Sequence, residues 1–82
     1  MKRDLITFRS ITPAQQAQRV LRRSGIEADL QRTPRQLEHR GCGYGLRIRP
    51  EQTEEAVMLL RSSGIQFNRN FTQENGIWEE RK

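Results

Sequence analysis

A ten-residue segment of the chain occurs twice, 39 positions apart (17 to 56), and this repeat constrains the fold more than any other feature of the sequence. Residues 17–26 read AQRVLRRSGI and residues 56–65 read AVMLLRSSGI. In both copies an apolar stripe with helical spacing precedes Ser-Gly-Ile. A repeat of this length accommodates one strand–helix–strand unit. The chain is therefore expected to contain two such units in succession.

Residues at the ends of each copy predict where the two helices start and stop. Thr12 as N-cap and Pro13 as first helical residue open the first helix, and Pro50 opens the second. Gly25 and Gly64 follow the last helical residues, where glycine can take the left-handed conformation that ends a helix. The repeat thus predicts two helices of similar design.

Apolar or alternating segments on either side of the helices predict four strands, at residues 5–8, 26–30, 44–48 and 65–71. The resulting order is β-α-β followed by β-α-β. Two such units typically close as a ferredoxin-like βαββαβ sandwich, an α+β fold with a four-stranded antiparallel sheet and both helices on one face.

The domain is expected to end before the last residues of the chain. Residues 1–71 contain both units, and residues 72–82 are interpreted as a C-terminal tail. Asn75-Gly76 is a turn signal, so the tail is expected to carry a short extra strand or to pack against the domain.

Length and composition exclude several classes of protein. A chain of 82 residues with 33% hydrophobic residues supports one small domain with a thin core. It lacks the about 18–20 consecutive apolar residues of a membrane-spanning helix, so no membrane role is expected. The N-terminus, MKRDLITFRS, turns polar too soon for a secretory signal. Cys42, the single cysteine, cannot form an intramolecular disulfide, which favours a cytoplasmic setting.

The net charge of +5 arises from 15 Lys and Arg against 10 Asp and Glu. Only Lys2 and Lys82 are lysines, so the basic surface consists mainly of arginine. Arginine suits fixed pairing with carboxylates and other anions. Several arginines lie at predicted helix ends, which reduces the weight of net charge as evidence for nucleic-acid binding.

Residues 33–45, between the second and third predicted strands, are not explained by the repeat. Cys42 lies there between two glycines, which remove side-chain bulk and permit close approach of a ligand. Nearby arginines favour the thiolate, and a histidine three positions away could accept the thiol proton. The alternative is a small buried cysteine at the start of a strand. The candidate site residues are Cys42, Gly41, Gly43, Arg35, Arg40 and His39.

The segments LITF, TPRQL and GCGYGLRIRPE, with two helices ending in SGI, resemble the selenium/sulfur carrier protein-like family over roughly residues 4–71. The most specific part is Pro34-Arg35 followed by Gly41-Cys42-Gly43 and a strand. The resemblance implies a carrier rather than a true enzyme. Its cysteine would accept sulfur or selenium from a donor protein and pass it to an acceptor protein. The Cys-Pro-x-Pro motif of related sulfur carriers is absent.

Two other functions remain open from the residues alone. Gly43 to Ile48 partly resembles the RNA-binding motif on the third strand of RRM domains, although Leu46 stands where a second stacking aromatic belongs. The arginines could also give salt-dependent affinity for nucleic acid. A small-molecule-binding regulatory domain of the same fold is the second alternative.

No metal and no cofactor are expected. His39 and Cys42 have a spacing that could hold a metal ion, but a structural zinc needs four ligands and the chain has no further Cys or His. Only a homodimer that pools two sites would supply enough ligands, and an exposed strand edge could support such a dimer.

Overall fold

The computed structural model describes residues 2–37 and 43–81. The elements, in chain order, are β1 (Lys2–Phe8), α1 (Ile11–Arg23), β2 (Asp29–Arg32), the 3-10 helix η1 (Arg35–Leu37), β3 (Tyr44–Ile48), the 3-10 helix η2 (Pro50–Gln52), α2 (Thr53–Ser62), β4 (Arg69–Glu74) and β5 (Ile77–Glu80). None of the helices in these two ranges is long and apolar enough to cross a membrane.

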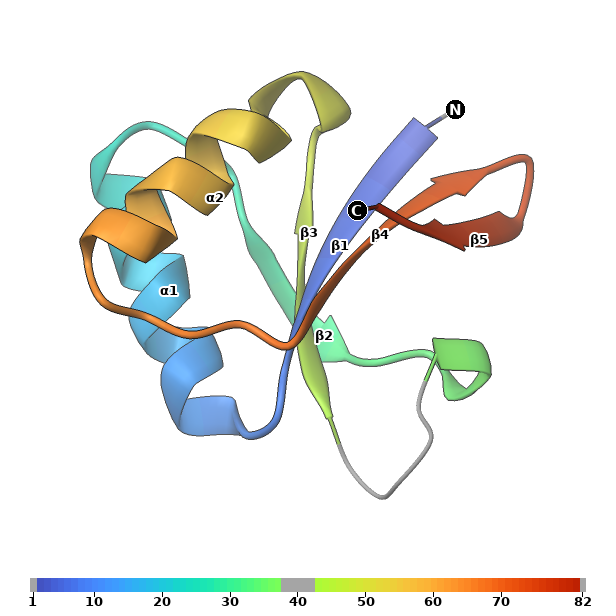
Figure 1. Ribbon diagram of the computed structural model, residues 1–82, viewed down its shortest axis with the longest axis horizontal. Helices are drawn as coiled ribbons and strands as arrows, with labels where there is room; N and C mark the ends of the chain where they lie inside the picture. Colours follow the sequence, from blue (N-terminus) through green and yellow to red (C-terminus); the bar gives the residue numbers. More distant parts are fainter. Residues whose placement is uncertain (1, 38–42, 82) are drawn as a thin grey trace.

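The strands form one antiparallel sheet with the order β2-β3-β1-β4-β5, and both helices lie on the same face (Figure 1). The predicted α+β class and the antiparallel sheet are confirmed, but the strand count of four is wrong. The fifth strand, β5, pairs with β4 across a two-residue turn. Asn75 and Gly76 have φ angles of 53° and 79°, the mirror-image turn geometry that matches the twist of a hairpin.

Both helices end in the manner that the repeat predicts. Gly25 and Gly64 have φ angles of 80° and 71°, in the left-handed region. The N–H of Ile26 donates to the carbonyl of Leu21 at 2.9 Å, and the N–H of Ile65 donates to that of Leu60 at 2.9 Å. The N–H of each glycine donates to the carbonyl three residues earlier. Each helix therefore ends in a Schellman motif that satisfies carbonyls of its last turn.

The predicted start of the first helix is wrong. Helix α1 begins at Ile11, so Thr12 lies inside its first turn and is not the N-cap. Ser10 precedes the helix with an extended backbone (φ −145°, ψ 170°) and makes no side-chain cap hydrogen bond. The reason is that Pro13 does not fix the first helical position, because the N–H groups of the whole first turn have no partner within the helix and a proline is tolerated there. Pro50 opens η2, which leads directly into α2.

Strands β2 and β4 begin later than the sequence predicts, at Asp29 and Arg69. Ile26 and Ala28 are buried, as strand residues would be, but they belong to the connection after α1. Apolar residues of this connection pack into the core because the Schellman motif turns the chain back onto the helix. The apolar pattern of the sequence therefore placed the start of this strand too early.

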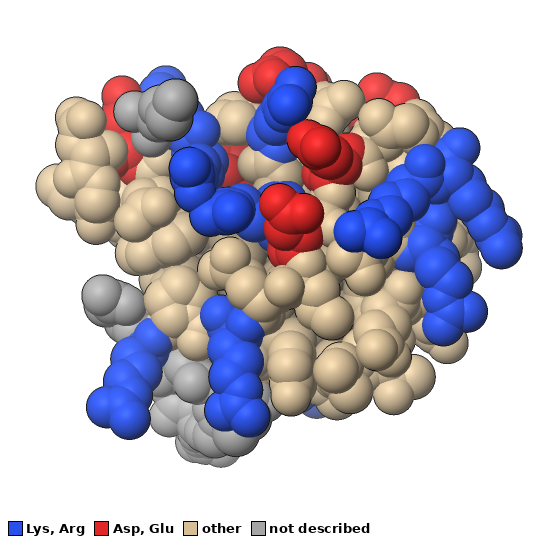
Figure 2. Space-filling model, turned by 180° about the vertical axis from the view of Figure 1, so that it is seen from behind, with Lys and Arg blue, Asp and Glu red and all other residues tan. Residues whose placement is uncertain are grey.

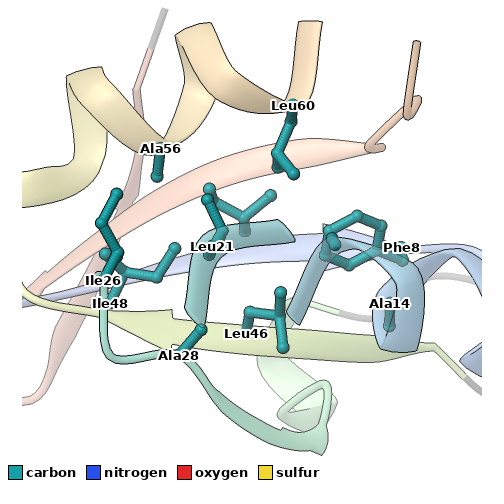
Figure 3. Close-up of a cluster of buried hydrophobic side chains, with 11 residues drawn as sticks. Phe8, Ala14, Leu21, Ile26, Ala28, Leu46, Ile48, Ala56 and Leu60 are labelled. Atoms are coloured by element: carbon teal, nitrogen blue, oxygen red, sulfur yellow. The ribbon is translucent and has the colours of Figure 1, made fainter. Parts of the chain in front are cut away.

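The core lies between the sheet and the two helices (Figure 3). Ala56 and Leu60 point from α2 toward Leu21 of α1, and Leu46 and Ile48 rise toward them from β3. All five side chains are at most 2% exposed. This small continuous core fixes both helices on one face of the sheet, while Leu5 and Phe71 are buried on the opposite face.

A buried carboxylate joins the central strand to three other elements. Asp4 of β1 is 0% exposed. It accepts hydrogen bonds from Thr53 Oγ1 at 2.6 Å and from Thr72 Oγ1 at 3.0 Å, and it pairs with the guanidinium of Arg81. These partners belong to α2, to β4 and to the residue after β5. Asp4 therefore fastens the start of α2 and the end of the chain to the middle of the sheet.

We expect Thr53→Val to destabilise the protein by about 1–3 kcal/mol, because it leaves the buried Asp4 carboxylate without one of its donors. Thr12→Val is the matched control, since Thr12 is exposed in the first turn of α1. That change should stay within about 0.5 kcal/mol of the wild type. Urea unfolding at neutral pH measures both. Equal losses for the two variants would contradict the role given to Asp4.

Candidate functional site

The connection between β2 and β3 carries the sequence-predicted thiol site, and its two ends are held together. The backbone N–H of Thr33 donates to the carbonyl of Gly43 at 3.0 Å. The 3-10 helix η1 follows, closed by a hydrogen bond from the N–H of Leu37 to the carbonyl of Pro34 at 2.9 Å. Thr33 and Gly43 therefore hold together the two ends of this connection, residues 34–42, which we call the thiol segment.

Four of the six predicted site residues, His39, Arg40, Gly41 and Cys42, lie outside the described residues. The other two, Arg35 and Gly43, lie at the two ends of the connection. Arg35 begins η1 and is exposed, and Gly43 directly precedes β3 and is half-buried. The structure thus describes the two ends of the connection, and the cysteine lies between them in the sequence.

Gly43 has close neighbours that leave little room for a side chain. A Cβ at this position would lie 3.0 Å from Thr33 Oγ1 and 3.4 Å from the carbonyl oxygen of Phe8. Gly45 has an even closer neighbour, because a Cβ there would lie 2.7 Å from Leu5 Cδ1. Leu5 is fully buried. Two of the glycines around the cysteine therefore have a structural reason that is independent of any chemistry at the thiol.

Thr33 presents a buried hydroxyl at the root of the thiol segment. The residue is 8% exposed. Within residues 2–37 and 43–81 its Oγ1 has no hydrogen-bond partner. Buried polar atoms are normally hydrogen-bonded, so a buried hydroxyl without a partner among the described residues is unusual.

The end of the sheet from which this connection departs is basic. We call it the loop end: β1 and β2 finish there, and β3 and β4 begin there. The arginines that lie in or beside the strand termini of the loop end are Arg9, Arg32, Arg35 and Arg69. The opposite termini carry basic residues as well, but Lys2, Arg47 and Arg49 there pair with Glu74, Asp29 and Glu27. Figure 2 shows basic side chains over much of this face, whereas the visible acids are confined to its upper half.

This distribution has a chemical consequence. Positive charges stabilise an anion, such as a thiolate, more than its neutral form. Part of the charge is already paired, since Arg69 lies 3.5 Å from Glu80. Arg47, which is also close to Cys42 in sequence, lies further along β3, 3.9 Å from Asp29. Among the described residues, Arg35 is thus the arginine that lies within the thiol segment.

Tyr44 does not occupy the position that the RNA-binding alternative requires. In β3 it shares the helix-covered face with Leu46 and Ile48 and packs against the core. The face of β3 away from the helices carries Gly45 and Arg47 instead. A base cannot stack on Tyr44 from that face, which is where RRM-type sheets hold RNA.

The described residues contain no group of three or more His, Cys, Asp or Glu side chains that could hold a metal ion. His39 and Cys42, the pair considered from the sequence, lie outside this part of the chain.

Sequence reasoning missed the network around Asp4. The available signal was an acid at an inward position of a strand, because Asp4 alternates with the buried Ile6 and Phe8. Its partners Thr72 and Arg81 are 68 and 77 residues away in the chain. No local pattern connects residues at such separations.

A family model described as "Putative Se/S carrier protein-like" matches residues 4–71, a range that includes β1, both helices and the thiol segment. None of the curated proteins matches the chain.

We expect Gly45→Ala to destabilise the protein by about 1–3 kcal/mol, because the new methyl group overlaps the fully buried Leu5. Gly43→Ala should cost less, since the group it meets is the hydroxyl of Thr33 at 3.0 Å. Urea unfolding gives the stability of each variant, and the alkylation rate of Cys42 gives its reactivity. A Gly45→Ala variant as stable as the wild type would contradict the expected overlap between the new methyl group and Leu5.

Proposed function

Because the chain belongs to the "Putative Se/S carrier protein-like" family, we propose that it holds sulfur or selenium on the thiol of Cys42 and passes it to an acceptor protein. The family match carries this proposal, since it spans the whole segment in which the cysteine lies. The basic loop end supports it, because both a thiolate and a persulfide anion are stabilised by neighbouring arginines.

The transfer is a thiol exchange. The Cys42 thiolate attacks the terminal sulfur of a donor persulfide, R–S–S–H, and a new sulfur–sulfur bond forms at Cys42. The sulfur–sulfur bond of the donor breaks, and the donor leaves as the thiolate R–S⁻. Cys42 then carries –S–S–H, and the transferred sulfur keeps its oxidation state, so no oxidant is consumed. A selenopersulfide, R–S–Se–H, reacts in the same way. An acceptor thiolate removes the cargo by repeating the exchange.

The other predicted site residues have supporting roles in this proposal. Arg35 and Arg40 stabilise the anionic thiol and its cargo. Gly41 and Gly43 leave room for a donor to approach, and His39 accepts the thiol proton. The chain acts as a carrier without a metal or a cofactor, and its partners are the proteins that supply and receive the cargo. A reducing, cytoplasmic setting fits this chemistry, because an oxidising compartment would trap the thiol as a disulfide.

We assign the fold of residues 1–71 as ferredoxin-like. Two successive strand–helix–strand units, an antiparallel order of β2-β3-β1-β4 and both helices on one face support this assignment. Residues 72–82 then form an extension that completes β4 and adds β5 at its outer edge.

We expect incubation with a cysteine desulfurase and cysteine to add about 32 mass units to Cys42, and a selenium donor to add about 79, as a persulfide or its selenium analogue forms. Intact-protein mass spectrometry under non-reducing conditions measures the adduct, and peptide mapping places it. Cys42→Ser is the control and should remain unmodified. A reducing agent should remove the adduct from the wild-type protein.

The absence of an adduct has two meanings, which a second measurement separates. If iodoacetamide alkylates Cys42 rapidly in the folded protein, the thiol is accessible and the chosen donor is the wrong one, so further persulfide donors are tested. If alkylation is slow until the protein is unfolded, Cys42 is buried and the carrier function is refuted.

We expect Arg35→Gln to slow alkylation of Cys42 near neutral pH, because removal of a positive charge disfavours the thiolate. The effect should be less than about tenfold, since Arg35 is exposed and screened by solvent and salt. It should vanish in about 1 M salt. Arg23→Gln is the matched control, because Arg23 is exposed at the end of α1 that lies away from the loop end. Equal rates for both variants would exclude an electrostatic role for Arg35.

A further inference from the structure

A cavity of about 450 Å³ lies on the other side of the central strand from the thiol segment, between α2, the start of β4 and the end of β5. Helix α2 packs mainly against α1, while β4 and β5 extend past it (Figure 1). The helix-side face of these two strands is therefore not filled by α2. The volume lies within the range of typical small-molecule sites, and none of the lining residues belongs to the β2–β3 connection.

The cavity combines apolar surface with a positive charge that is available to a ligand. Its apolar lining includes Val57, Met58 and Phe67. Met58 is 70% exposed, which is unusual for a large apolar side chain. The guanidinium of Arg61 lies over the ring of Phe67, 6.0 Å from its centroid. In the part of the chain that the structure describes, no carboxylate lies within ion-pair distance of Arg61. Arg61 can therefore bind an anionic group beside an apolar wall.

The buried side-chain oxygen of Asn70 favours a ligand that also carries a hydrogen-bond donor. Asn70 lines the cavity, and its Oδ1 is buried with no donor among residues 2–37 and 43–81. Asn70 pairs with Ile6 of β1, which places it on the helix-covered face of β4. A buried carbonyl oxygen without a donor is costly, so an N–H group of a ligand would be favourable here.

The wall opposite α2 is held rigidly. The backbone N–H of Arg81 donates to the carbonyl of Asn70 at 2.7 Å, and its guanidinium pairs with the buried Asp4. Glu80, beside it, lies 3.5 Å from Arg69. The family match ends at residue 71, so the hairpin that supplies this wall lies beyond it. The cavity is completed by the C-terminal extension.

We propose that this cavity binds a small carboxylate with a planar apolar body and an N–H donor. The carboxylate pairs with Arg61, the planar body lies against Val57 and Phe67, and the N–H donates to Asn70 Oδ1. The charged hydrogen bond supplies most of the selectivity, because it is stronger than a neutral one. This binding site is separate from the chalcogen transfer at Cys42 and does not depend on it.

Indole-3-acetate is a suitable probe because it has all three features, and its analogues remove them singly. Titration of the isotope-labelled full chain is followed by ¹H–¹⁵N NMR. We expect saturable shifts at the amides of Val57, Arg61 and Asn70. Tryptamine, which has the same ring system with a positive charge, and 1-methylindole-3-acetate, which lacks the N–H, should both bind at least about tenfold more weakly.

Variants of the protein complete the test. Arg61→Gln should weaken indole-3-acetate binding by about tenfold or more, whereas Arg23→Gln, at the end of the other helix, should leave it unchanged. Cys42→Ser should also bind normally. The proposal is overturned if tryptamine binds as tightly as indole-3-acetate. It is equally overturned if the two arginine variants behave alike, or if the shifts spread over the arginine-rich surface without saturating.

Discussion

The buried carboxylate of Asp4 is the interaction on which the arrangement of the layers depends. It lies on the central strand, and its hydrogen bonds to Thr53 and Thr72 and its pairing with Arg81 reach α2, β4 and the chain end. A carboxylate that is 0% exposed is stable only while its partners are present, because a buried unpaired charge costs about 3–5 kcal/mol. Each partner element is therefore held in place by the same group. This explains how a chain with a thin core and two short helices keeps a five-stranded sheet together.

Several features of the fold could be predicted from the sequence because their causes are local. The two Schellman motifs follow from a glycine after an amphipathic helix, and Asn75-Gly76 specifies its own turn. The start of α1 was not predictable from Thr12 and Pro13, because a proline is tolerated at several positions of the first turn. The starts of β2 and β4 were misplaced because register and pairing across the sheet decide them, and no short window of sequence contains that information.

In the candidate site, too, some features have local causes and others depend on distant parts of the chain. The sequence indicates the thiol and its glycines, but it does not show why the glycines are there. Gly43 and Gly45 face Thr33 and Leu5 at distances that no side chain tolerates without movement. Their proximity to the cysteine is therefore weaker evidence for reactivity than it is on sequence grounds alone. The basic loop end is the independent support, and it is visible only when the strand termini are brought together.

The thiol segment and the cavity are attached to opposite sides of β1. The carbonyl of Phe8, at one end of this strand, lies against Gly43, and Asp4, near the other end, holds Arg81 beside the cavity. Between them the strand is buried and paired on both edges, so it separates the two sites within the sheet. The sites nevertheless share one residue, because Arg69 lines the cavity and also belongs to the loop end. Since positive charge at the loop end favours a thiolate, a carboxylate bound beside Arg69 would oppose that effect through charge alone, without any movement of β1.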